Sequence, residues 1–163
     1  MTPTTALNRF QAEHRKRVLY PEDSRSEIHY GFRLGELNIL LRSMEKVEVI
    51  ESTQACPVPN TPGWFSGMIN LRGELIPVFD LDFLLTKNPA MTKWIMVFRH
   101  DNHSAGIYIN TLPAGITPEP VSENRPELPD IFDGCVENIF SQEGSIWLET
   151  DFDKLFRKLR NCF

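Results

Sequence analysis

The chain has 163 residues, of which 41% are hydrophobic and 24% are charged, and its net charge at pH 7 is −5. A chain of this length and composition can bury a core without a metal or a disulfide, so we expect one globular unit or two small ones that share a core. The negative charge argues against nucleic acid and anionic membrane as general partners. Residues 1–20 hold four basic side chains and one acidic one, which leaves a net charge of −8 for the remainder.

The cysteine content and the hydrophobic runs indicate a cytoplasmic protein. The three cysteines have no metal-like or redox-like spacing, which is typical of thiols in a reducing compartment. Residues 1–27 contain no apolar run of seven or more residues, and no stretch of the chain is long enough to span a bilayer. We therefore expect no signal peptide and no direct insertion into a membrane.

The first 26 residues are expected to form an extension outside the main domain, which we place at residues 27–160. Leu7, Phe10 and Val18 fall on one face of a short predicted helix within residues 5–18. Pro21 lies in a polar linker that would follow this helix. The helix could pack on the core, bind a partner or fray as a chain terminus.

From residue 28 the pattern changes to that of β structure. Apolar residues alternate with other residues, which predicts a half-buried strand whose inward face carries Ile28, Tyr30, Phe32 and Leu34. The next predicted elements are a turn at 35–36, a strand at 37–41, a helical turn at 43–46 and a strand at 47–50.

The most informative segment is residues 59–81, with the sequence PNTPGWFSGMINLRGELIPVFDL. Two apolar runs, 67–71 and 75–81, flank Arg72-Gly73-Glu74. Because glycine readily takes the positive φ that a short turn needs, the segment predicts a tight β-hairpin. Pro77 inside the second run argues for an edge strand or a bulge.

Further short strands and one helix complete the expected secondary structure. The remaining predicted elements are a connector at 81–85, a hairpin of 94–98 with 105–110, an exposed irregular loop at 117–129, a hairpin of 135–140 with 145–149, and a closing helix. Asp151 can cap that helix, whose apolar stripe consists of Phe152, Leu155, Phe156 and Leu159. Many short strands favour small barrels or a sandwich. The tryptophans stand in strand-like contexts and are expected to pack in the core: Trp64, Trp94 and Trp147.

The segment with N-L-R-G, a proline-bearing strand and D-L resembles the signature of the CheW-like coupling domain of bacterial chemosensory systems. The resemblance extends over roughly residues 27–159. It implies a mainly β fold of two small SH3-like five-stranded barrels that share a hydrophobic core, with short helices that include a C-terminal one. The N-terminal extension, the opening GFRLG at 31–35 and the late IWL at 146–148 resemble the PilI-like branch, which serves type IV pili and twitching motility.

The resemblance implies a non-catalytic adaptor with two partners. One is the cytoplasmic tip of a methyl-accepting chemoreceptor, and the other is a CheA-type histidine kinase, bound through its own CheW-like regulatory domain in receptor arrays at the inner membrane. The implied partner-binding residues are Arg72, Asn70 and Glu48. The position of Glu48 follows from counting back without gaps, and Glu45 and Lys46 are neighbouring alternatives. From the residues alone, Arg72 also fits a solvated turn arginine and Glu48 a solvated face.

Two other classes of function fit the sequence less well than the adaptor. A small acidic β-barrel hydrolase would need an activated nucleophile, but the cysteines have no flanking base or glycine-rich elbow. A nucleic-acid-binding module would need a basic face with aromatic residues. His100-Asp101-Asn102-His103 places two imidazoles close together, but without a second ligand pair it is read as a hairpin turn. We therefore expect no cofactor, no metal and no catalytic residues.

Overall fold

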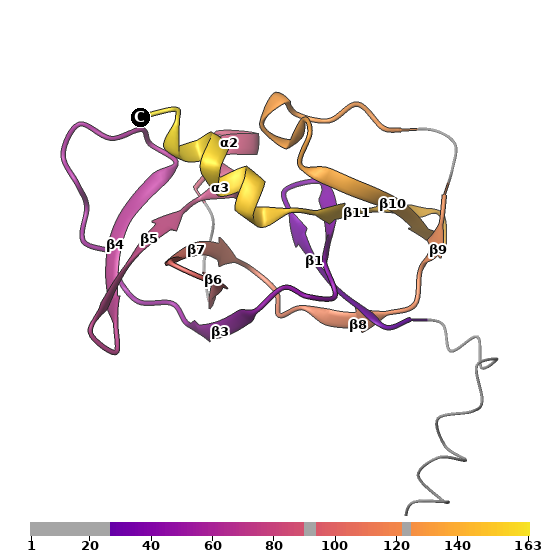
Figure 1. Ribbon diagram of the computed structural model, residues 1–163. Helices are drawn as coiled ribbons and strands as arrows, with labels where there is room; N and C mark the ends of the chain where they lie inside the picture. Colours follow the sequence, from indigo (N-terminus) through magenta and orange to yellow (C-terminus); the bar gives the residue numbers. More distant parts are fainter. Residues whose placement is uncertain (1–26, 90–93, 122–124) are drawn as a thin grey trace, which may run out of the picture.

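The computed structural model describes residues 27–89, 94–121 and 125–163 and contains two β-sheets with a helix lying across them (Figure 1). The helix predicted within residues 5–18 lies outside the described residues. In the described part of the chain, no helix has both the length and the apolarity needed to cross a bilayer.

The first sheet joins the start of the domain to its end. Its six strands lie in the order β8-β1-β2-β11-β10-β9, and the parallel pairing of β11 with β2 connects the last hairpin to the first. Its strands are β1 (His29–Leu34), β2 (Leu37–Leu41), β8 (Ala114–Ile116), β9 (Glu119–Pro120), β10 (Val136–Gln142) and β11 (Ser145–Thr150). The short strands β8 and β9 form the two edges of this sheet, which therefore has six strands where five were expected.

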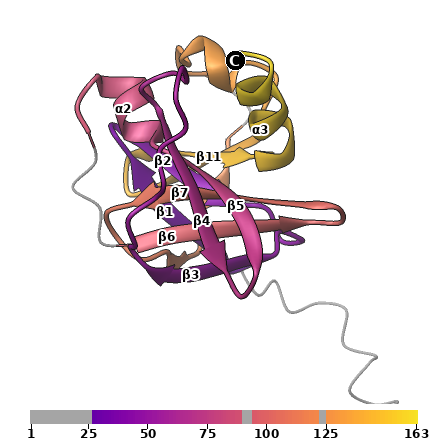
Figure 2. The same cartoon turned by 90° about the vertical axis from the view of Figure 1, so that its left-hand side faces the viewer.

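The second sheet contains the predicted signature hairpin and curls into a barrel. Its strands are β3 (Val47–Glu51), β4 (Phe65–Leu71), β5 (Glu74–Phe79), β6 (Trp94–His100) and β7 (His103–Ile109), in the order β3-β6-β7-β5-β4. Beyond β3, Cys56 exchanges two backbone hydrogen bonds with Met68 of β4, at 2.8 and 2.9 Å. The chain that follows one edge strand thus pairs with the other edge strand, and Figure 2 shows β4 and β5 crossing in front of β6.

One hydrophobic core is shared by the two sheets and the closing helix α3 (Phe152–Arg160). The rings of Phe98 from β6 and Phe152 from α3 stack with their centroids 4.2 Å apart. Phe32 from β1 packs on the same Phe152 ring at 6.1 Å. Full burial of one such side chain stabilises the fold by about 1.5–3 kcal/mol. This packing confirms the expected shared core and the expected apolar stripe of α3.

An aspartate caps the first turn of each of the two described α-helices. The carboxylate of Asp151 accepts a hydrogen bond from the backbone N–H of Lys154 at 3.1 Å, which confirms the predicted cap of α3. Asp80 caps α2 (Leu81–Thr86) in the same way, through the N–H of Phe83 at 2.9 Å. The segment predicted as a connector at 81–85 is therefore a short helix, and the strand predicted to reach residue 81 ends at Phe79.

Two further expectations were wrong in detail. Ser43 and Met44 form a turn rather than a turn of helix. Pro77 lies in β5, which is an interior strand between β7 and β4. The proline is tolerated there because the pairing of β5 with β7 includes only Val78 and Phe79 and does not reach it.

The inward face of β1 also differs from the prediction at its start. Phe32 and Leu34 are buried as expected, but Tyr30 is 57% exposed whereas His29 is buried. The His29 ring lies 4.8 Å from the ring of Phe140 on β10. Phe140, from the same sheet, thus packs against the face of β1 that carries His29, whereas Tyr30 on the opposite face lines an open groove.

Candidate partner-binding site

The β4–β5 hairpin presents Arg72 from a strained backbone position. Arg72 and Gly73 have φ angles of 53° and 86°, so both central residues of the turn lie in the left-handed region, as in a type I′ turn. The side chain of Asn70 accepts a hydrogen bond from the Gly73 N–H at 2.9 Å and holds the turn. Only the positive φ of Gly73 was expected. A non-glycine residue in this region is a strained one, and such strain is often retained for function.

The side chain of Arg72 contacts Glu48 on β3. Its Nη2 lies 2.6 Å from Oε1 and 2.5 Å from Oε2 of that carboxylate. β3 and β4 are at opposite ends of the strand order, so this contact depends on the closure of the barrel. The two side chains are 64% and 32% exposed, respectively, and remain accessible to a partner.

Two more residues extend this ion pair into a network of alternating charge. Arg99, near the end of β6, lies 3.3 Å from Glu48 and 2.7 Å from Glu74. Hydrogen bonds, first from Arg72 and then from Arg99, hold the pKa of Glu48 below its usual range. Ser104 and Arg99 lower the pKa of Glu74 in the same way. We call Arg72, Glu48, Arg99 and Glu74 the charged network.

The structure brings the three sequence-predicted site residues to one surface and adds two that the sequence did not indicate. Glu48 and Arg72 are in direct contact, and Asn70 shapes the turn that presents Arg72. Arg99 and Glu74 were missed because the contacts of Arg99 with Glu48 and with Glu74 follow from strand pairing and barrel closure. The alternation of acids and bases in neighbouring strand ends was the one signal that could have suggested them.

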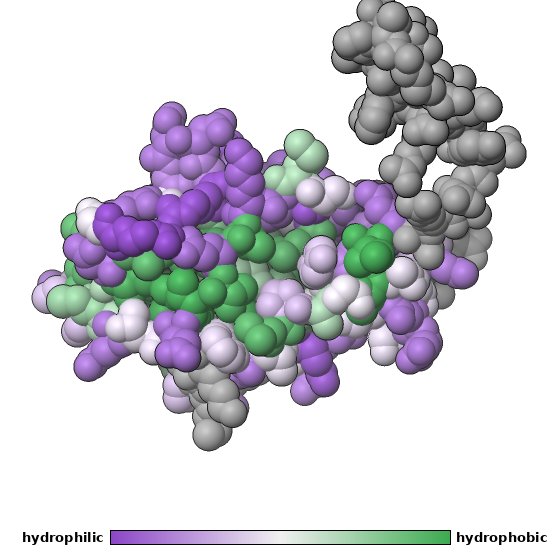
Figure 3. Space-filling view, turned by 90° about the horizontal axis from the view of Figure 1, so that it is seen from below, coloured by the Kyte–Doolittle hydropathy of each residue, from purple (hydrophilic) through white to green (hydrophobic). Residues whose placement is uncertain are grey.

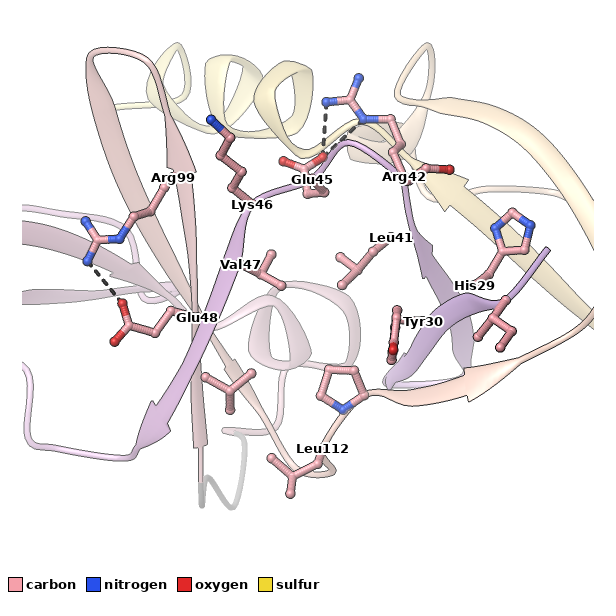
Figure 4. A pocket seen from close by; sticks show the side chains of 14 residues that line it. His29, Tyr30, Leu41, Arg42, Glu45, Lys46, Val47, Glu48, Arg99 and Leu112 are labelled. Atoms are coloured by element: carbon pink, nitrogen blue, oxygen red, sulfur yellow. Dashed lines mark hydrogen bonds and ion pairs between the residues drawn. The ribbon is translucent and has the colours of Figure 1, made fainter. Parts of the chain in front are cut away.

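An apolar groove of about 930 Å³ lies between the two sheets, beside the charged network. Figure 4 shows Tyr30, Leu41, Val47 and Leu112 around it, with Glu48 and Arg99 joined by an ion pair at one side. Large hydrophobic side chains are exposed around this groove, including Ile28 at 65% and Leu112 at 52%. Figure 3 shows a hydrophobic band along this underside of the molecule. A surface of this kind typically marks an interaction site.

The neighbouring alternatives for Glu48 have different surroundings. The side chain of Glu45 is 1% exposed and is held by Arg42 at 3.1 Å and by His100 at 2.9 Å. Lys46 lines the groove without belonging to the charged network. Glu48 is therefore the more accessible of the two candidate carboxylates.

The cysteines show no arrangement that would activate a nucleophile in the described part of the chain. Cys135 is buried, and burial raises the pKa of its thiol. A buried thiol with a raised pKa is a poor nucleophile at neutral pH. Cys56 and Cys162 are exposed.

Comparison with known proteins finds relatives that include FrzA, CheW and PilI. FrzA of Myxococcus xanthus is 36% identical over 61 residues, which are 37% of this chain and 38% of that protein. The chemotaxis protein CheW of Helicobacter pylori is 26% identical over 118 residues, or 64% of this chain and 71% of that protein. PilI of Pseudomonas aeruginosa is 29% identical over 119 residues, or 69% and 66% of the two chains.

These figures show that the aligned part of the chain spans from about two fifths to seven tenths of the length of these relatives. Chemotaxis and pilus proteins match at similar identity, so membership of the PilI-like branch stays a prediction.

The fold also has a solved counterpart. The crystal structure of the scaffolding protein TtCheW from Thermoanaerobacter tengcongensis matches with a TM-score of 0.66 and 23% identity, over 84% of this chain and 92% of that one. This likeness confirms the predicted two-barrel, mainly β fold. A family model, the CheW-like domain, matches residues 29–160. The chain therefore belongs to the family of CheW-like domains.

Proposed function

We propose that this chain is a non-catalytic adaptor that couples a methyl-accepting chemoreceptor to a CheA-type histidine kinase, in chemotaxis or twitching motility. The observation that carries the proposal is the exposed charged network beside an apolar groove, on a domain of the CheW-like family. An adaptor needs two separate surfaces, so that one partner can bias the state of the other.

The groove suits the receptor. The cytoplasmic tip of a chemoreceptor is a helical hairpin, and an amphipathic helix binds by laying its apolar face in a hydrophobic groove. Tyr30, Val47 and Leu112 supply apolar contacts, and Arg99 and Glu48 at the groove's side can pair with charges on the helix.

The β4–β5 hairpin suits the kinase. Leu75 lies opposite Asn70 in the hairpin and is 65% exposed, next to the equally accessible Arg72. These residues present an apolar contact and a cation on one projecting element. The kinase's own CheW-like domain would bind here, barrel against barrel, and would hold the adaptor in cytoplasmic receptor arrays at the inner membrane.

The test is calorimetric titration of the full chain with the isolated CheW-like domain of the cognate kinase. We expect saturable binding that is weakened by R72A and retained by R160A, which removes an exposed arginine at the end of α3. Absence of binding at high micromolar concentration, with every kinase of the same organism, would refute the proposal. Hydrolysis of a substrate that is lost on substitution of one cysteine would favour an enzyme instead.

A further inference from the structure

A cluster of two histidines and one aspartate lies at the tip of the β6–β7 hairpin. His100 ends β6 and His103 begins β7, and the two are directly opposite each other in the strand register. Their ring centroids are 5.4 Å apart. The carboxylate of Asp153, in the first turn of α3, faces both rings. The sequence does not reveal this third member, because it lies 50 residues beyond His103.

The three potential ligand atoms are close to one another. Nε2 of His103 lies 3.2 Å from Oδ1 of Asp153, and Nδ1 of His100 lies 3.9 Å from the same oxygen. Each of the three residues offers a ligand atom within 4.8 Å of those of the other two. Ligands about 2.0–2.1 Å from one ion lie about 3–4 Å apart, so small side-chain rotations suffice to bring these atoms around a common centre.

The surroundings of His100 fix which of its ring nitrogens can bind an ion. Its Nε2 lies 2.9 Å from Oε1 of Glu45, a side chain that is 1% exposed and that Arg42 also holds. When Nε2 donates a hydrogen bond to this carboxylate, the neutral imidazole keeps a lone pair on Nδ1. Nδ1 is buried and has no hydrogen-bond partner among the described residues. Buried polar atoms without a partner are rare, and each one calls for an explanation.

A carboxylate behind one ring nitrogen, with the other nitrogen unoccupied, is the arrangement in which histidines typically bind metals. An ion pair between His100 and Asp153 is a weaker explanation, because 3.9 Å is too long for a hydrogen bond. Arg157 binds Oδ2 of Asp153 at 2.5 Å, which leaves Oδ1 directed at the two rings.

We propose that His100, His103 and Asp153 bind one divalent transition-metal ion, with zinc as the ion of choice. Two imidazoles and one carboxylate suit zinc, whereas magnesium and calcium prefer oxygen ligands alone. The cluster borders an open depression, so solvent or a partner side chain can fill a fourth position. The bound ion would connect the β6–β7 hairpin to α3. Through the contact of His100 with Glu45 it would also fix the position of Glu45, three residues before Glu48 of the charged network.

The proposal departs from the sequence-based expectation of no metal, and it is independent of the proposed adaptor function. The test uses the full chain, freed of metal with a chelator and titrated with zinc chloride in a calorimeter. We expect one saturable site per chain and a rise in melting temperature with excess zinc, because an ion that binds only the folded state stabilises it.

Two sets of variants separate this site from adventitious binding. H103Q changes a ligand whose side chain is 38% exposed and should therefore fold, yet it should bind zinc at least tenfold more weakly. E45Q should weaken binding by about 10- to 100-fold through the orientation of His100. The double variant C56S/C162S removes two exposed thiols outside the cluster and should bind as the unaltered chain does.

Cobalt(II) gives a second readout. We expect visible absorption bands that saturate at one ion per chain, without the near-ultraviolet band of a thiolate ligand, and their loss in H103Q. The proposal is wrong if the unaltered chain shows no saturable zinc binding, or if a folded H103Q binds zinc as tightly as the unaltered chain.

Discussion

Substitution of Arg72 should separate the stability of the β4–β5 hairpin from its role in binding. The φ angle of Arg72 is 53°, in the left-handed region. This conformation costs a residue with a Cβ about 1–2 kcal/mol, and alanine keeps that cost. Asparagine tolerates the conformation, and Asn-Gly is a preferred pair in type I′ turns. We therefore expect the free energy of unfolding of R72N to exceed that of R72A by about 1 kcal/mol.

Neither variant should unfold through loss of the contact with Glu48. The Arg72 side chain is 64% exposed, and ion pairs between exposed side chains contribute little to stability. Glu48 also retains Arg99 at 3.3 Å, so its carboxylate is not left unpaired. Denaturant titration of the unaltered chain and both variants measures these free energies.

Binding should respond differently from stability. A hydrogen bond from a charged group to a partner is worth about 1.5–3 kcal/mol. Its loss corresponds to an increase in Kd of about 10- to 150-fold. R72N and R72A should both show this increase against the kinase domain, although R72N is the more stable. If R72N binds and activates the kinase normally, Arg72 is a solvated turn residue. If both variants unfold, its role is structural.

Three further predictions concern residues outside the charged network. The ring of Trp64 stacks on that of Phe79 with their centroids 6.0 Å apart, but the side chain is only partly buried. W64A should therefore lower the free energy of unfolding by about 2 kcal/mol. An unchanged melting temperature would contradict this. Burial raises the pKa of Asp82 above its unfolded value. The contribution of Asp82 to the free energy of unfolding therefore falls as the pH rises from the unfolded pKa to the folded pKa. The stability of D82N relative to the unaltered chain should therefore increase as the pH rises above about 4, the unfolded pKa of aspartate. A flat or opposite trend in denaturation at several pH values would refute the assignment. Y30E should weaken receptor binding, because Tyr30 lines the groove, and L75E should weaken binding of the kinase domain, because Leu75 lies on the hairpin. Each variant should have little effect on the other partner. Equal losses for both partners would argue against two surfaces.

The parts of the fold that the sequence predicts correctly are those determined by local patterns. Apolar runs separated by short polar turns, two of which contain glycine, predicted the three hairpins, and Asp151 with its apolar stripe predicted α3. Helix α2 was missed because its six residues are too short to show a helical period, although Asp80 before Leu81 is a capping signal.

What the sequence could not predict depends on contacts between distant segments. The burial of His29 depends on packing against Phe140 of β10, which is far from β1 along the chain, and Tyr30 is exposed because it lines the groove. The contact of Arg72 with Glu48 requires a closed barrel, which no residue spacing encodes. Asp153 meets the two histidines because α3 packs on the shared core.

The charged network also suggests how a partner can engage Arg72 at low cost. In the described structure, Arg72 contacts Glu48 through one of its nitrogens, whereas a guanidinium carries five N–H donors in a planar fork. Glu48 is bound by Arg99 as well, which is in turn held by Glu74. If Arg72 turns towards a partner carboxylate, Glu48 keeps a cation and no charge is left unpaired. Arg72 can therefore exchange one carboxylate for another, so that the net gain on binding depends on the geometry that the partner offers.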